Sequence, residues 1–167
     1  DGFDADTVEI QCRSHTQSAD IALGTNDEVG GAGDQGMMFG GACTQTPELM
    51  PLPVALARAL SNRLTQCVHS TDLLRADGKT QVSVEYDENG KVVGIDTVVV
   101  SVMHSADFEI EELRKYVREG VIAPVLANYG FDIADVANIH INPTGNFVIG
   151  GPNGDTGLTG RKIIVDT

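Results

Sequence analysis

The chain has 167 residues, which is enough for one compact domain with its own core. Its 24 acidic residues outnumber its 11 basic ones, and the net charge of −13 argues against a nucleic-acid partner, which would require an extended positive surface. No apolar run approaches the roughly 20 residues of a membrane span and no leader sequence is visible, so no membrane partner is expected and the cytoplasm is the expected location.

The first quarter of the chain contains one predicted strand and two predicted loops. Thr7 to Cys12 alternates in polarity, which predicts a strand with one buried face. Ile21 to Glu28 is polar, acidic and aperiodic, which predicts a mobile loop. The glycine cluster from Gly30 to Gly41 contains a Gly-x-Gly-x-x-Gly pattern, but an acidic loop precedes it and a poor helix start follows. A Rossmann dinucleotide site is therefore excluded.

The middle of the chain is predicted to form two helices separated by a hairpin. The first helix is expected from about Leu52 to Thr65, because its apolar residues repeat on one face. Thr80 to Tyr86 and Lys91 to Met103 alternate like strands, and Glu88-Asn-Gly90 between them predicts a tight turn. The second helix is expected from about Glu109 to Ala127.

The second helix is followed by a predicted short strand. Pro124 should kink the helix or end it early, and Gly130 is placed to cap it. Asn138 to Asn142 then predicts a strand. The order of elements indicates an α+β fold, with helices packed on one face of a largely antiparallel sheet.

A glycine-rich stretch closes the chain, with six glycines from Gly145 to Gly160. Two short strands are predicted to flank its turn, Phe147 to Ile149 and Ile163 to Val165. Asp155 lies at its centre, and Arg161 and Lys162 form an isolated positive spot suited to a polyphosphate. From this loop alone, a structural turn and a ligand-binding loop are equally open interpretations.

Three stretches resemble signatures of the bacterial-type S-adenosylmethionine synthetases, which are methionine adenosyltransferases. These stretches are Gly31-Ala-Gly-Asp-Gln-Gly-Met-Met-Phe-Gly40, Arg75-Ala-Asp-Gly-Lys-Thr-Gln-Val82 and Phe147 to Asp166. The similarity runs over essentially the whole chain and covers the middle of that family's polypeptide, which has a three-domain pseudo-symmetric fold. It implies three segments: the end of the N-terminal segment with a gating loop, the central segment, and the start of the C-terminal segment, at residues 1–28, 29–148 and 149–167.

The resemblance implies ATP and L-methionine as substrates. Enzymes of this family let the methionine sulfur attack the ribose C5′ and then cleave the displaced tripolyphosphate to pyrophosphate and phosphate. The multiply charged leaving group must be stabilised as it departs, whereas the uncharged sulfur needs only positioning. The resemblance also implies self-association as a homodimer or homotetramer with sites between subunits.

Roles for single residues follow from the resemblance. The implied ATP-binding residues are Asp77, Lys79, Asn146, Phe147, Asp155, Arg161 and Lys162. The implied methionine-binding residues are Gln17, Asp34 and Asp155. The implied gating loop contains Ile21, Gly24, Asp27 and Glu28. Lys79 and Arg161 would act on the phosphates and are the implied catalytic residues. Without the family, Phe147 would be interpreted as a core aromatic and Lys79 as a solvated strand end.

Two features depart from the family. Asn146 stands where the family usually has Arg, so a bidentate phosphate donor is lost. The family's elements that supply the catalytic His, the Mg²⁺ carboxylates and a K⁺-binding Glu are not found in these 167 residues. Ligands for Mg²⁺ and K⁺ are therefore expected outside this chain, and no metal site within it. The chain alone is expected to be inactive, and a non-catalytic nucleotide-binding or dimerisation fragment is the alternative.

Overall fold

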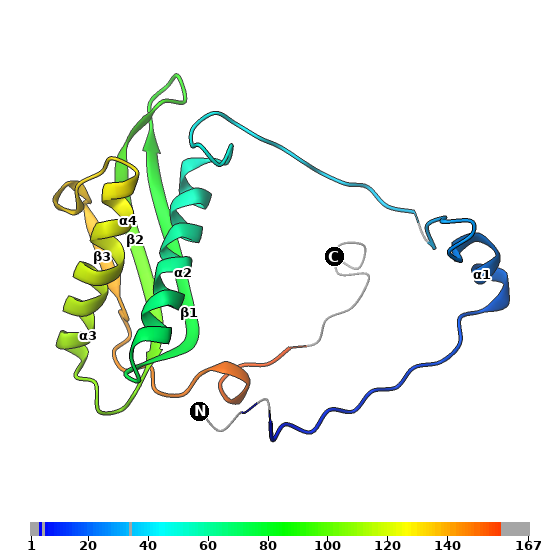
Figure 1. Cartoon of the computed structure of the whole chain (residues 1–167). Helices are drawn as coiled ribbons and strands as arrows, with labels where there is room; N and C mark the ends of the chain where they lie inside the picture. Colours follow the sequence, from blue (N-terminus) through cyan, green and yellow to red (C-terminus); the bar gives the residue numbers. More distant parts are fainter. Residues whose placement is uncertain (1–3, 5, 34, 158–167) are drawn as a thin grey trace. The chain divides into compact units, whose positions relative to one another are not determined.

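The structure is a computed structural model that describes residues 4, 6–33 and 35–157 (Figure 1). The chain divides into two units, one of residues Asp4–Gly41 and one whose described part begins at Ala42. Each unit is described by itself below.

The described part of the smaller unit contains one short helix, α1 (Ala19–Thr25), with no buried residue. The predicted strand from Thr7 to Cys12 is wrong, because these described residues pair with no strand and Ile10 is 81% exposed. An alternating pattern needs a partner strand and an apolar surface, and the described residues of this unit contain neither a second strand nor a buried side chain. The predicted loop from Ile21 to Glu28 is partly helical, since α1 continues to Thr25.

The larger unit contains the core. Its regular elements in chain order are α2 (Leu52–Ser70), β1 (Leu74–Tyr86), β2 (Val92–His104), α3 (Ile110–Val117), η1 (Arg118–Ile122), α4 (Ala123–Asn128), η2 (Ile133–Asp135), β3 (Asn138–Ile141) and η3 (Gly151–Asn153). The three strands described form one sheet in the order β1-β2-β3, with β1 antiparallel and β3 parallel to β2. Figure 1 shows α2, α3 and α4 against this sheet, which confirms the predicted α+β fold class.

The predicted hairpin is confirmed. The Asp87 carboxylate accepts hydrogen bonds from the backbone N–H groups of Asn89 and Lys91 at 2.9 and 2.8 Å. Gly90 has φ +75°, a conformation that glycine adopts without steric cost. Strand β1 begins at Leu74 instead of Thr80, so the Arg75 to Val82 motif lies within the strand.

The second predicted helix is one helical segment with a π turn inside it. Pro124 has no N–H to donate to the carbonyl of Gly120, four residues earlier. Arg63 of α2 satisfies that carbonyl instead, because its Nε donates to the Gly120 oxygen at 2.9 Å. The segment is therefore locally widened at η1 rather than broken. Gly130, at φ +82°, caps its end as predicted.

The hydrophobic core lies between the helices and the covered face of the sheet. Strand β2 contributes Val98, Val100 and Val102, which are all fully buried because alternate residues of a strand face the same side. Helix α2 contributes Leu56 and Leu60, also fully buried. Further fully buried side chains from the second helical segment are Leu113, Val117, Val121, Ile122 and Leu126. In the part of the chain that the structure describes, no helix is long and apolar enough to cross a membrane.

A hydrogen bond of 2.9 Å from the Tyr129 hydroxyl to a Glu48 carboxylate oxygen joins the end of α4 to the segment before α2. Burial raises the pKa of Tyr129 above 10.0, and the hydrogen bond and charge of Glu48 raise it further. Hydrogen bonds from the backbone and then from Tyr129 lower the pKa of Glu48 below 4.5. The contact is thus made by a neutral phenol and an ionised carboxylate.

Tyr129→Phe is expected to flatten the pH dependence of the free energy of unfolding at alkaline pH. A raised tyrosine pKa gives stability that is complete below pH 10.0 and is lost as the pH rises through the folded-state pKa. The wild type should therefore lose more stability in that range than the variant, as measured by urea unfolding. Tyr116→Phe is the control, and equal losses in the wild type and Tyr129→Phe would contradict the prediction.

Candidate functional site

An irregularity in β1 places Asp77 beside the loop that follows β3. Leu74 pairs with His104 and Gly78 pairs with Val102. Between these two pairs, β1 advances by four residues while β2 advances by two. Such a bulge re-aims the side chains within it. The Asp77 Oδ2 atom accepts a hydrogen bond of 2.8 Å from the backbone N–H of Gly151. The start of β1 and the glycine-rich stretch are therefore directly joined.

Phe147 lies near the start of that stretch and does not form the predicted strand. Phe147 to Ile149 is irregular, and Phe147 is hydrogen-bonded to His104 at the end of β2. The backbone N–H of His104 donates to the Phe147 carbonyl at 2.9 Å. The Phe147 N–H is bound at 3.0 Å by the imidazole Nε2 of His104. Since the second bond goes to a side chain, no backbone ladder continues, and the strand prediction is wrong.

Three of the predicted site residues line one hollow. Asp77 and Lys79 reach it from β1, and Asp155 reaches it from just beyond η3. The rest of its lining consists of Ala76, Gly151 and Pro152. Two carboxylates and one ammonium group offer acceptors for hydroxyl or ammonium groups and a donor for an anion. The sequence separation of Asp77 and Asp155 gives no indication of this proximity.

The ring of Phe147 lies close to the same place. A Cβ atom added to Gly150 would be 2.8 Å from both the Asp77 Oδ2 and the Phe147 Cε2, and 3.0 Å from the Met103 sulfur. A side chain at Gly150 would therefore displace these three neighbours, which come from β1, β2 and the glycine-rich stretch. Asn146, immediately before Phe147, is exposed.

The remaining predicted site residues fall in the smaller unit or outside the described residues. Gln17 and the segment Ile21 to Glu28, with Gly24 and Asp27, belong to the smaller unit. Asp34, Arg161 and Lys162 lie outside the described residues.

Two residues at this site, Met103 and His104, were not predicted. Both are buried, at 5% and 1% exposure, and both contact the glycine-rich stretch. The available signal in the sequence is an imidazole at the end of an apolar strand, next to a turn. That pattern alone indicates a buried histidine and gives it no function.

Asn142 fixes the direction in which the chain leaves β3. Its side-chain amide makes two hydrogen bonds to the backbone of Val102, at 2.8 and 2.9 Å, although its own φ is +42°. Arg114 of α3 donates to the carbonyls of Ile141 and Asn142 at 3.1 and 3.2 Å. These contacts satisfy the polar groups at the end of β3 and lead the chain towards Phe147.

Comparison with known sequences gives the family. The sequence model of the S-adenosylmethionine synthetase central domain matches residues 29–147. The chain belongs to the S-adenosylmethionine synthetase family. A protein named S-adenosylmethionine synthase from Fusobacterium nucleatum subsp. nucleatum is 52% identical over 168 residues, which cover 99% of this chain. The match covers 43% of that relative, so the chain spans less than half of its length. The resemblance predicted from the three sequence stretches is confirmed.

The described part of this S-adenosylmethionine synthetase chain does not fit a metal centre. Among the residues placed by the structure, no three His, Cys, Asp or Glu side chains are grouped so that they could hold a metal ion. Asp77 and Asp155 share a hollow, but Asp77 already uses one oxygen to bind Gly151. We therefore derive no catalytic step through Mg²⁺ or K⁺ from these residues.

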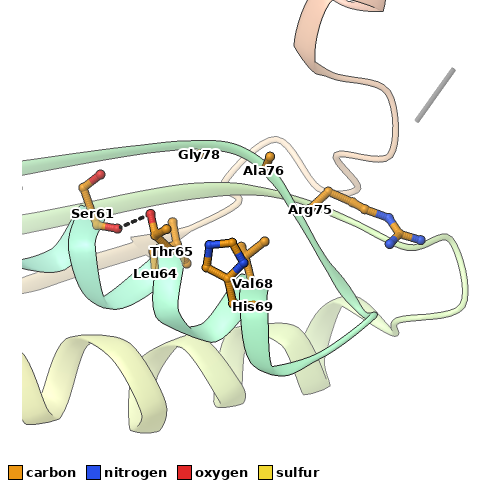
Figure 2. Close-up of a pocket in the computed structure, with 8 residues that line it drawn as sticks. All are labelled: Ser61, Leu64, Thr65, Val68, His69, Arg75, Ala76 and Gly78. Atoms are coloured by element: carbon orange, nitrogen blue, oxygen red, sulfur yellow. Dashed lines mark hydrogen bonds between the residues drawn. The ribbon is translucent and has the colours of Figure 1, made fainter. Parts of the chain in front are cut away.

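A second hollow, which Ala76 also lines, lies between the end of α2 and the start of β1 (Figure 2). Its lining residues are Ser61, Leu64, Thr65, Val68, His69, Arg75, Ala76 and Gly78. The Thr65 hydroxyl is bonded to the Ser61 carbonyl, and Figure 2 shows the Arg75 guanidinium pointing away from the other lining residues. With no carboxylate, and with the Arg75 guanidinium pointing outward, this hollow offers a nucleotide fewer charged partners than the one at Asp77.

Proposed function

We propose that the protein containing this chain is a methionine adenosyltransferase. It forms S-adenosylmethionine from ATP and L-methionine and cleaves the tripolyphosphate to pyrophosphate and phosphate. The observation that carries the proposal is the meeting of Asp77, Lys79 and Asp155 in one hollow, with the Phe147 ring and the Asp77 carboxylate both beside Gly150. Membership of the S-adenosylmethionine synthetase family supports it.

One residue of the hollow supplies positive charge, and the others position the substrates. Lys79 binds the phosphates, and it stabilises negative charge more strongly as the tripolyphosphate departs. The Asp77 oxygen that does not bind Gly151 accepts from the nucleoside, and Asp155 accepts from the ribose or the methionine ammonium group. The Phe147 ring stacks on adenine, because an aromatic face suits a planar base. Together these contacts hold the ribose C5′ in line with the methionine sulfur.

The proposal extends to residues beyond the hollow. Arg161 and Lys162 bind phosphates and Asn146 lies beside the nucleotide, while Gln17 and Asp34 bind methionine. Ile21 to Glu28 forms the gating loop, and its residues up to Thr25 belong to α1. Mg²⁺ and K⁺ are the cofactors, with ligands outside this chain, and the whole enzyme is a homodimer or homotetramer. The 167 residues by themselves, which span 43% of the relative, are an inactive nucleotide-binding segment under this proposal.

The first test of the proposal is Lys79→Ala in the full-length enzyme that carries this chain. The rate of tripolyphosphate formation in a single turnover should fall by about 10²-fold or more, because a charge contact to the leaving group is lost. The Michaelis constant for methionine should change little, since the sulfur is uncharged.

Lys91→Ala is the matched control, because Lys91 is exposed at the hairpin turn, and its rate should equal that of the wild type. A normal rate in Lys79→Ala would remove Lys79 from the site. Absence of S-adenosylmethionine formation by the unmodified enzyme would overturn the proposed function itself.

A further inference from the structure

His104 is a buried imidazole whose two ring nitrogens both have backbone partners. Its Nδ1 lies 2.8 Å from the carbonyl oxygen of Ser105, and its Nε2 lies 3.0 Å from the backbone nitrogen of Phe147. A carbonyl can only accept and an amide N–H can only donate. The proton is therefore on Nδ1, and Nε2 is the acceptor, which assigns the ring as one neutral tautomer.

His104 makes hydrogen bonds to both the N–H and the carbonyl of Phe147. Its backbone N–H donates to the Phe147 carbonyl at 2.9 Å, and its ring accepts from the Phe147 N–H. With 1% of its surface exposed, His104 has little freedom to turn away. Phe147 is thus fixed to the end of β2 by one residue on two sides.

The loop is fixed again four residues later. Gly151 donates its N–H to Asp77, and the buried Gly150 lies against the Met103 sulfur and the Phe147 ring. The segment from Phe147 to Gly151 therefore spans two anchors, His104 on β2 and Asp77 on β1. A substitution of the His104 side chain removes only the bond to the Phe147 N–H, while the backbone bond from His104 and the anchor at Asp77 remain.

We propose that His104 is the positioning residue for the nucleotide-stacking loop of this enzyme. Its neutral ring, protonated on Nδ1, fixes the backbone of Phe147 and thereby the place of the ring against adenine. The inference rests on the proposed function for the adenine that Phe147 stacks on. The contact between His104 and Phe147 does not depend on that function. His104 itself touches the loop and not the reacting atoms.

Two substitutions separate the two ring contacts. In His104→Gln the side-chain oxygen reaches the position of Nε2 and can still accept from Phe147. In His104→Asn the shorter amide stands at the position of Nδ1, so it can donate to Ser105 but cannot reach Phe147. Both variants lose the imidazole and remain polar, but Asn is one methylene shorter and leaves more empty space at this buried site. An unchanged Michaelis constant for methionine therefore serves as the check that this loss of packing has not spread through the enzyme.

The experiment compares the two variants in the full-length enzyme that carries this chain. In His104→Asn, the Phe147 amide should exchange with deuterium about 10-fold faster than in the wild type, and the Michaelis constant for ATP should rise by about 10-fold. His104→Gln should restore both values, and the Michaelis constant for methionine should stay the same in all three proteins. Equal exchange at Phe147 in the two variants would overturn the proposal.

If a variant does not fold, the tautomer of His104 in the wild-type protein is an independent test. A long-range ¹H–¹⁵N spectrum of the ¹⁵N-histidine-labelled protein should show the Nδ1–H tautomer for His104. The Nε2–H tautomer would overturn the proposal. Failure of the enzyme to use ATP would refute the proposed function, whereas the exchange at Phe147 and the tautomer would still decide whether His104 positions the loop.

Discussion

Gly150→Ala is expected to lower the kcat/KM for ATP by about 10²-fold while the core stays folded. The added Cβ would meet the Asp77 carboxylate and the Phe147 ring at 2.8 Å and the Met103 sulfur at 3.0 Å. These neighbours are the ends of side chains, so they can move apart at little cost to the fold. The groups that move are those proposed to hold the nucleoside, and a displacement of about 1 Å at such a site is enough for the expected loss.

Gly157→Ala is the control for this substitution. Gly157 lies in the same stretch, but a Cβ there meets none of the described residues within 4 Å and its φ is not in the left-handed region. Its steady-state kinetics should equal those of the wild type. If Gly150→Ala and Gly157→Ala behave alike, the contact between Gly150 and the site residues has no role in catalysis.

Leu60→Ala is expected to lower the free energy of unfolding by about 2–5 kcal/mol. Leu60 is fully buried in the cluster that joins α2 to the sheet and the second helical segment. Removing its branched end leaves a cavity among side chains that are themselves fully buried, such as Leu56 and Val100.

Urea unfolding followed by circular dichroism measures this loss. Arg58→Ala is the control, because Arg58 lies on α2 with its side chain exposed, and its effect should stay within about 0.5 kcal/mol. A loss below about 1 kcal/mol for Leu60→Ala would contradict the packing of α2 against the sheet.

The hairpin and the core helices were predictable because their signals are local. Asp87 to Lys91 contains its own turn chemistry, so the turn was correct to the residue. The apolar periods of α2 and of the second helical segment gave their buried faces, although α2 continues to Ser70, beyond the predicted end at Thr65. Helix ends are weakly marked when no glycine or proline follows at once.

The predictions that failed depended on partners distant in sequence. The alternation from Thr7 to Cys12 is compatible with a strand, but no described strand pairs with it. Phe147 to Ile149 has the composition of a strand, yet its N–H binds an imidazole and its neighbour Gly150 packs against side chains. A pattern of residue types cannot indicate which distant group will accept a given backbone hydrogen.

The sequence by itself determined the family, the α+β class, the hairpin and the residue types proposed to bind ATP and methionine. Each of these depends on short stretches whose chemistry is complete within a few residues. The tertiary structure alone decided that Asp77, Lys79 and Asp155 share one hollow, and that His104 and Met103 hold the loop beside it. The physical reason is that the bulge in β1 and the path of the chain after β3 bring together residues more than 40 positions apart, through contacts that packing creates and local propensity does not encode.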